Sequence, residues 1–442
     1  MTREEKTRPG QSDAENLKVS PQAPQPAERQ EPAELADDMR EKSARVLLHA
    51  GPREEFPPEY RANAERVVTE FLELQPGERV LFITDQNEHN TDPRLIALLQ
   101  EAMEKKGGTS TVFRIEGQKE RHIQTPELQQ LIAAHDVIWI ASDVSDETLP
   151  VGFDAILEKL DATTGKRMAH CTGVQVDLLS NDGALSEPKE MMEQRMDAIE
   201  KRVEHVAGFH ITTAFGTDLW MSLKPGRTWY KASGRIPRGS WDNLPGGEIF
   251  TTPDQEHVNG TLVLSTLHDD VTPEQGVDQP VELQIKDGKI VQIEGGTSAE
   301  KLRTYLQENS QMADDPEDVY TCAEIAFGVN TKATALETHI GDFDWQKEGP
   351  SAVITEKRLG TVHVAFGSDN HGYITGKPGD ARGKNRAKNI PTHLDFVLAQ
   401  EGLTVRAFHS LEAFERAKAA GSSAEGSESL IENGDFRLFA DN

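Results

Sequence analysis

Residues 75–115, QPGERVLFITDQNEHNTDPRLIALLQEAMEKKGGTSTVFRI, contain the pattern that decides the fold of the N-terminal half. A Pro-Gly turn precedes an apolar run from Val80 to Ile83, which predicts a buried strand. The apolar spacing over 94–106 predicts a helix, and the pair Gly107-Gly108 is typical of a helix C-terminus. A second apolar strand follows. A strand, a helix and a strand in this order predict a parallel α/β sheet.

The flanking sequence extends this pattern and then changes character. DVIWIAS (136–142) predicts a further strand, and a long helix over 187–206 ends the α/β part. From Gly208 onward the chain alternates apolar strands with turns, as in FHITTAFGTDLWMSL, GTLVLSTL and the hairpin VELQIKDGKIVQIEGG with Asp287-Gly288 at its turn. We therefore predict an α/β N-terminal domain followed by a β-rich α+β catalytic domain.

The composition of the first residues sets them apart from the rest. The segment PQAPQPAERQEPAELADD is rich in Pro, Gln and Glu and has no apolar period, so it cannot bury enough surface to fold. We predict a disordered tail over 1–55, the α/β domain over 56–206 and the metal-binding catalytic domain over 207–442.

Charge and cysteine content exclude several classes of protein. The net charge of the 442 residues is −28 and no basic stripe is present, which argues against nucleic-acid binding. No apolar run approaches the ~20 residues that span a bilayer, and the start lacks a secretory signal, so we expect a cytoplasmic protein without a membrane partner. The two cysteines, Cys171 and Cys322, form no C-x-x-C pair, which suits a reducing compartment.

Two histidines and an aspartate in the C-terminal half have the spacing of metal ligands. In TVHVAFG (361–367), strand alternation places His363 on the face with the small residues, opposite the apolar face. His393 and Asp395 are two residues apart, so an extended chain projects both from one face. The carboxylate then either shares a metal with the imidazole or orients its ring. A structural role for each histidine is the alternative.

Two glutamates lie in surroundings that favour burial. Glu248 follows the turn LPGG, and Glu324 is flanked by apolar residues in CAEIAFG. A buried carboxylate costs several kcal/mol unless it is paired or binds a metal, so a metal site and a buried salt bridge are the two interpretations. Two Glu, two His and one Asp exceed the needs of one catalytic ion. A bridging carboxylate between two ions about 3.5–4 Å apart would account for the surplus, with Zn, Co, Mn or Mg as the divalent metals.

Four motifs carry a family resemblance: NLPGGEIFTTP, AEIAFGVNTKA, EKRLGTVHVAFGSD and NIPTHLDFVL. In this order they resemble the thermophilic metallo-aminopeptidase family (peptidase family M29, leucyl aminopeptidase or aminopeptidase T and S type), over residues 60 to 405. The resemblance implies a homodimeric aminopeptidase that removes N-terminal residues from peptide substrates. It implies two metal ions bound by five ligands, which are Glu248, Glu324, His363, His393 and Asp395. We expect Glu324 also to act as the general base.

One position departs from that family. Its best-known members have a tyrosine seven residues after the first histidine, where this chain has Asn370, and Tyr373 is the candidate catalytic substitute. Two alternatives therefore stay open. One is a non-haem Fe(II) ring-cleaving dioxygenase of the same fold that uses His363, His393 and Asp395, and the other is a catalytically weakened peptide-binding relative. The presence of both glutamates favours two metals and hydrolysis.

Overall fold

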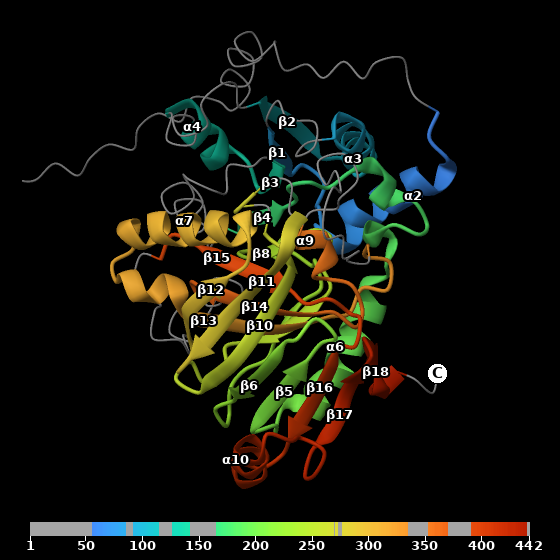
Figure 1. The fold of residues 1–442 in the computed structure, drawn as a ribbon. Coiled ribbons are helices and arrows are strands. Elements are labelled where there is room, and N and C mark those ends of the chain that lie inside the picture. The colour runs from blue at the N-terminus through green and yellow to red at the C-terminus, as the bar shows by residue number, and fades with distance from the viewer. Residues whose placement is uncertain are drawn as a thin grey trace, which may run out of the picture. The chain divides into compact units, whose positions relative to one another are not determined.

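A parallel sheet forms the first part of the computed structural model (Figure 1). The structure describes residues 55–84, 92–114, 126–141, 165–268, 270–272, 276–334, 352–369 and 390–439. Within these ranges the sheet has the order β2-β1-β3-β4-β8, and all neighbouring strands run parallel. Its strands are β1 (Arg79–Thr84), β2 (Thr109–Arg114), β3 (Val137–Ala141), β4 (Arg167–His170) and β8 (Trp241–Asn243). Residues 1–54, nearly all of the expected tail, lie outside the described ranges.

The helices of this part follow the apolar pattern of the sequence. They are α2 (Pro58–Arg66) with the π-helical turn η2 (Val67–Phe71), α3 (Pro93–Lys105) and α4 (Pro126–Ala134). Asp92 caps α3 by accepting a hydrogen bond from the Arg94 N–H, and Gly107 follows the helix with a φ of +85°. The described residues between 75 and 114 therefore form β1, α3 and β2 as expected, and the predicted α/β class of this part is confirmed.

The chain returns to the parallel sheet after leaving it. The helix α6 (Lys189–Val203) follows β4, with the 3₁₀ turns η4 (Val176–Leu179) and η5 (Ala184–Ser186) between them. The strand β8 then pairs with β4 although it lies beyond the expected domain boundary at 206. The proposed boundaries at 55 and 206 stay predictions.

An antiparallel sheet forms much of the C-terminal part. Its order in the described chain is β12-β11-β10-β6-β5-β16-β17-β18. The strands are β5 (Gly208–Thr212), β6 (Asp218–Ser222), β10 (Val258–Thr266), β11 (Gly276–Lys286), β12 (Lys289–Glu294), β16 (Thr404–Phe408), β17 (Glu428–Glu432) and β18 (Asp435–Phe436). The turn between β11 and β12 has positive φ at Asp287 (49°) and Gly288 (76°), which is the two-residue hairpin turn that the sequence predicts.

A second antiparallel sheet, of order β15-β14-β13-β9-β7, carries the candidate site. Its strands are β7 (Tyr230–Ala232), β9 (Glu248–Thr251), β13 (Cys322–Gly328), β14 (Val362–Gly367) and β15 (His393–Val397). One face packs on the larger sheet, where the rings of Phe327 and Phe209 meet edge to face with centroids 5.7 Å apart. The predicted β-rich α+β class of the C-terminal part is confirmed.

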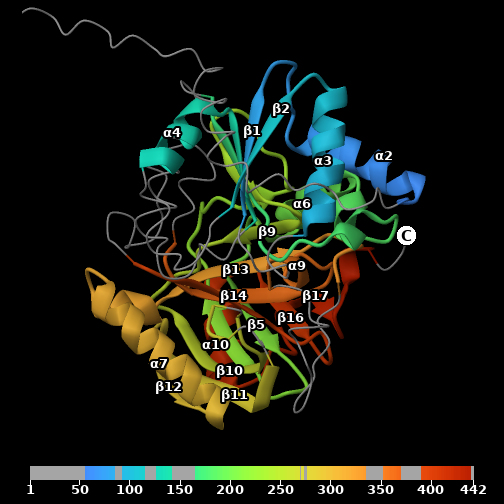
Figure 2. The same cartoon turned by 90° about the horizontal axis from the view of Figure 1, so that it is seen from above.

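Helices flank the larger sheet. Figures 1 and 2 show α7 (Thr297–Met312) alongside β11 and β12, and α10 (Leu411–Ala420) packs on β5, β6 and β16. Three short elements complete the described chain: η6 (Pro316–Tyr320), α9 (Ala352–Thr355) and η8 (Arg437–Phe439). Among the helices of the described ranges, none combines the length and apolar character needed to cross a bilayer.

Candidate metal centre

The register of four adjacent strands gathers the predicted ligands on one face of the smaller sheet. Glu248 begins β9, Glu324 lies on β13 and His363 lies on β14, while β15 carries the remaining two ligands. The pairs Gly328↔Glu248, Ala326↔His363 and Ala365↔Asp395 join these strands. Because side chains alternate along a strand, this register turns all five ligands to the same side. The opposite side carries the apolar residues that face the core.

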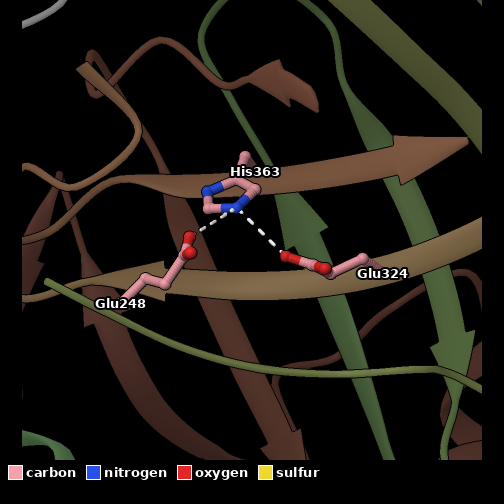
Figure 3. Close-up of side chains that lie close together, drawn as sticks. All are labelled: Glu248, Glu324 and His363. Carbon is pink, nitrogen blue, oxygen red and sulfur yellow. Dashed lines mark hydrogen bonds and ion pairs between the residues drawn. The ribbon is translucent and has the colours of Figure 1, made fainter. Parts of the chain in front are cut away.

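His363 is the central group of this cluster. Its Nε2 atom lies 3.1 Å from Glu248 Oε2, 3.2 Å from Glu324 Oε1 and 3.8 Å from Asp395 Oδ1. Figure 3 shows the imidazole between the carboxylates of Glu248 and Glu324, with Nε2 facing both. The side chain of His363 is 1 % exposed. The Nε2 atom of His363 is therefore surrounded by carboxylate oxygens that could bind a metal ion together with it.

The closing pair approaches the same point from β15. His393 Nε2 lies 3.4 Å from Asp395 Oδ1 and 3.8 Å from Glu324 Oε2. The other ring nitrogen, Nδ1, donates a hydrogen bond of 2.6 Å to the Ser368 carbonyl, which orients Nε2 toward the carboxylates. This is the arrangement of a histidine ligand whose outer nitrogen is held by the backbone.

Three overlapping groups of side chains are close enough to hold an ion. In each group the possible ligand atoms lie within 4.8 Å of one another, and the groups are Glu248/Glu324/His363, Glu324/His393/Asp395 and Glu356/His363/Asp395. Carboxylate oxygens and imidazole nitrogens suit iron, manganese, cobalt and zinc, and thiolates are absent from these groups. The donor set thus fits a divalent metal ion, and the predicted metal site is supported at this level. The number of ions and the role of each ligand stay predictions.

A buried lysine that the sequence does not single out lies beside the cluster. Lys357 is 1 % exposed, and its Nζ lies 2.6 Å from Glu248 Oε1 and 2.5 Å from Glu356 Oε1. Both glutamates are also buried. The pair Glu356-Lys357 opens the motif EKRLGTVHVAFGSD, and three consecutive charged residues shortly before an apolar strand are the signal that could have identified them. The buried salt bridge that was the alternative interpretation for Glu248 is therefore present.

The charges of the cluster shift the pKa values of its members. Burial alone would lower the pKa of His363, but the carboxylates of Glu248 and Glu324 raise it well above the usual value. Burial opposes a similar effect at His393, where Asp395 and then Glu324 raise the pKa to about 10. Burial raises the pKa of Glu356 to about 7 despite the adjacent Lys357. The carboxylates therefore attract positive charge to this point, and a divalent cation is one way to supply it.

The carboxyl edge of the parallel sheet lies beside the cluster. Asp242 on β8 interacts electrostatically with Lys357 and Glu248, and burial raises its pKa to about 7. His170 ends β4, and its Nδ1 donates to Asn243 Oδ1 at 3.1 Å. Burial lowers the pKa of His170. The carboxyl ends of parallel strands are a common place for ligands, so this edge and the metal cluster are two sides of one candidate site.

Two positions singled out in the sequence remain without a structural description. Tyr373, the candidate catalytic residue, and Asn370 both lie outside the described ranges. Their proposed roles stay predictions.

The sequence matches one protein family over most of its length. A model of the family described as NicX, 2,5-dihydroxypyridine 5,6-dioxygenase, matches residues 63–349. This range includes Glu248 and Glu324 and ends before His363. A 2,5-dihydroxypyridine 5,6-dioxygenase of Pseudomonas putida is 32 % identical over 157 residues, which are 34 % of this chain and 43 % of that protein. The match to this curated relative therefore spans less than half of the relative's length.

Two solved structures share the fold. The 2,5-dihydroxypyridine dioxygenase of Pseudomonas putida KT2440 superposes with a TM-score of 0.56 and 19 % identity over 85 % of this chain and 96 % of that one. The aminopeptidase AmpT of Thermus thermophilus gives a TM-score of 0.52 and 18 % identity over 86 % and 99 %. At these identities the two likenesses show the fold alone. The predicted relationship to the aminopeptidases is thus confirmed for the fold.

The predicted activity is wrong. The family model and the curated relative both name a dioxygenase, so the expected metallo-aminopeptidase, and with it the hydrolase and protease classes, is overturned. The physical reason lies in Glu248. In the sequence alone, its expected burial favours a second metal ion, whereas in the structure its Oε1 pairs with the ammonium of Lys357.

Proposed function

Because the chain belongs to the 2,5-dihydroxypyridine 5,6-dioxygenase (NicX) family, we propose that it is an iron(II)-dependent dioxygenase that opens a dihydroxylated pyridine ring. In such a reaction one molecule of dioxygen is consumed for each ring opened. Both oxygen atoms enter the open-chain product, and no further reductant is required. This is the dioxygenase alternative that the sequence left open, with a dihydroxypyridine as the substrate class.

The observation that carries the proposal is the convergence of His363, His393 and Asp395. Asp395 Oδ1 lies 3.8 Å from His363 Nε2 and 3.4 Å from His393 Nε2, so one carboxylate oxygen is within reach of both imidazoles. Two histidines and one carboxylate are the donor set of non-haem iron(II) oxygenases. Bound there, an iron(II) ion would supply the redox chemistry that dioxygen requires.

The residues around these three ligands hold them in place. The Ser368 carbonyl accepts the Nδ1 proton of His393 and fixes the orientation of its ring. Glu324 lies within 3.8 Å of both imidazoles, so it either joins the ligand set or accepts hydrogen bonds beside it. We propose the second role, since it leaves positions open for substrate and dioxygen.

The carboxyl edge of the parallel sheet would bind the organic substrate. His170 is an imidazole with a lowered pKa, and Asn243 holds its Nδ1 proton, so its Nε2 carries the lone pair at neutral pH. The hydroxyl of Thr172 lies 3.3 Å from that Nε2 atom. We propose that His170 accepts the proton of a ring hydroxyl when the dihydroxypyridine binds.

The test is a ring-opening assay with defined metal content. The ion-free protein is loaded with iron(II) without oxygen, mixed with 2,5-dihydroxypyridine and then exposed to ¹⁸O₂. The expected result is loss of the ring absorbance, uptake of one dioxygen per ring and two ¹⁸O atoms in the product. Protein carrying Asp395→Ala is the control and should consume neither 2,5-dihydroxypyridine nor dioxygen. Fully loaded protein that leaves the ring intact while binding it would contradict the proposal.

The expected homodimer is retained as a separate proposal. It rests on the family resemblance, and light scattering of the purified full-length chain tests it by giving the mass of the particle in solution.

A further inference from the structure

Lys357 places a buried positive charge beside the cluster of candidate metal ligands. Its Nζ contacts one oxygen of Glu248 at 2.6 Å and one oxygen of Glu356 at 2.5 Å, and all three side chains are almost completely buried. A buried ammonium is stable only where carboxylates compensate it, so these three groups form one ionic unit. That unit touches the metal ligands through Glu248 Oε2, which lies 3.1 Å from His363 Nε2.

The pairing of Lys357 divides the acidic residues of the cluster into two sets. Four carboxylates belong to the three possible ligand groups: Glu248, Glu324, Glu356 and Asp395. If one ion is held by the two histidines and Asp395, with Glu324 beside it, then Glu248 and Glu356 have no role in binding that ion. The two acids left over are those that Lys357 binds. A second ion would have to share these two carboxylates with the ammonium, which contacts Oε1 of each.

We propose that the ammonium of Lys357 takes the place of a second divalent cation and so limits this site to one metal ion. The inference rests on the proposed function, since it concerns the metal ion of that same site. Four carboxylates would neutralise two divalent ions. With the ammonium in place, a second divalent ion would leave a net positive charge in a buried site and would lie close to a like charge.

The number of metal ions determines which chemistry the site can perform. Two ions bridged by a carboxylate suit activation of water between them. A single ion with three protein ligands keeps adjacent positions open, which suits the joint binding of an organic substrate and a small gas molecule. Lys357 therefore acts as a positioning residue that selects between the two types of site. It does so through Glu248 and Glu356 and does not contact the reacting atoms.

The test is a count of bound ions in the variant Lys357→Met. Ion-free full-length protein is dialysed without oxygen against manganese(II), and the bound metal is measured by elemental analysis. We expect one ion per chain in the wild type and two in the variant, with the affinity for the second ion raised by about 100-fold or more. Electron paramagnetic resonance should show coupling between two manganese ions only in the variant. One ion in a folded Lys357→Met protein, or two in the wild type, would overturn the proposal.

Two controls separate charge from packing. Lys357→Arg keeps the positive charge and should bind one ion. Arg167→Met removes another buried cation, 1 % exposed and paired with Glu78 on the parallel sheet, and should also bind one. Two ions in either control would show that loosening the fold, and not loss of this charge, creates the second site.

A further variant covers the case in which Lys357→Met does not fold. Glu248→Gln should still bind one ion per chain, because in this proposal Glu248 pairs with the lysine and is not a ligand; the affinity should fall only through the loss of one nearby negative charge. Loss of that ion would refute the proposal. The bound ions are counted without pyridine substrate, so the result does not depend on whether the protein opens the ring.

Discussion

Asp92 joins the start of α3 to the segment that follows β4, and replacing it with alanine should destabilise the protein. Its side chain is 2 % exposed. It accepts hydrogen bonds of 2.9 Å from the N–H of Arg94 and of 2.9 Å from the N–H of Val176, 84 residues further along the chain. It also pairs with the Arg94 guanidinium at 2.9 Å. Alanine removes the cap and leaves the buried Val176 N–H without this acceptor.

The expected loss of stability follows from these three contacts. Loss of a helix N-cap costs about 1 kcal/mol. A buried N–H that loses its acceptor costs about 1–3 kcal/mol. The pair with Arg94, whose side chain is about half exposed, adds less than about 1 kcal/mol because solvent screens it. The free energy of unfolding of Asp92→Ala should therefore be about 2–4 kcal/mol lower than that of wild type.

This contribution should also depend on pH. Burial alone would raise the pKa of Asp92, but the Arg94 side chain and the N–H groups of Val176 and Arg94 lower it below the ordinary value of 3.8. A carboxyl whose pKa is lower in the folded state stabilises the protein above its unfolded pKa. That stabilisation is lost as the pH falls through the folded-state pKa. The difference between wild type and variant should thus be complete above about pH 4 and shrink below it.

Urea unfolding followed by tryptophan fluorescence measures the difference at pH 7 and at pH 3. Asp92→Asn is the matched control, because it keeps an acceptor oxygen and should lose about half as much as alanine. If the free energies of unfolding of wild type and Asp92→Ala differ by less than about 1 kcal/mol at pH 7, the cost assigned to the buried Val176 N–H is wrong. A difference that stays constant down to pH 3 would refute the assignment to an ionised carboxylate.

Three further predictions concern the site and its supports. His393→Ala should weaken iron(II) binding by more than about 100-fold in an anaerobic titration, whereas alanine at the exposed His257 should leave it unchanged; equal affinities would remove His393 from the ligand set. Gly246→Ala would place a Cβ 2.0 Å from the backbone nitrogen of Gly234, so the turn that presents the first glutamate should not form, and the variant should unfold in less urea or accumulate as aggregate. Phe414→Ala should lower the free energy of unfolding by about 3–5 kcal/mol through a core cavity while the number of bound ions stays unchanged; a cost below about 1 kcal/mol would contradict its burial at 0 % exposure.

Local pattern in the sequence determined the elements of the fold. The apolar run at 80–83, the helical spacing after Pro93 and the Asp287-Gly288 turn each appear in the structure where the sequence places them. The same holds for the common face of His393 and Asp395, which lie two residues apart on β15. These features depend on neighbours within one turn of helix or one strand, so a short stretch of sequence contains the information.

Contacts between distant segments decided the rest. The strand β8 joins the parallel sheet from beyond the expected boundary, and nothing local to Trp241–Asn243 identifies its partner. The order β15-β14-β13-β9 and its register bring together ligands from four segments separated by tens of residues. A shift of one residue in any of these pairings would turn a ligand into the core, and only the packing of the opposite face prevents it.

The chemistry of the site shows the same division. The residue types by themselves determined that a divalent metal fits, because carboxylates and imidazoles prefer such ions wherever they meet. They did not distinguish one ion from two, and the count of acids favoured two. Only the tertiary structure shows that Lys357 contacts Glu248 and Glu356 and neutralises part of their negative charge. Glu248 and Lys357 are more than 100 residues apart in the sequence, but their charged groups lie less than 3 Å apart in the structure. Because charges compensate one another through space, the linear sequence cannot predict this pairing.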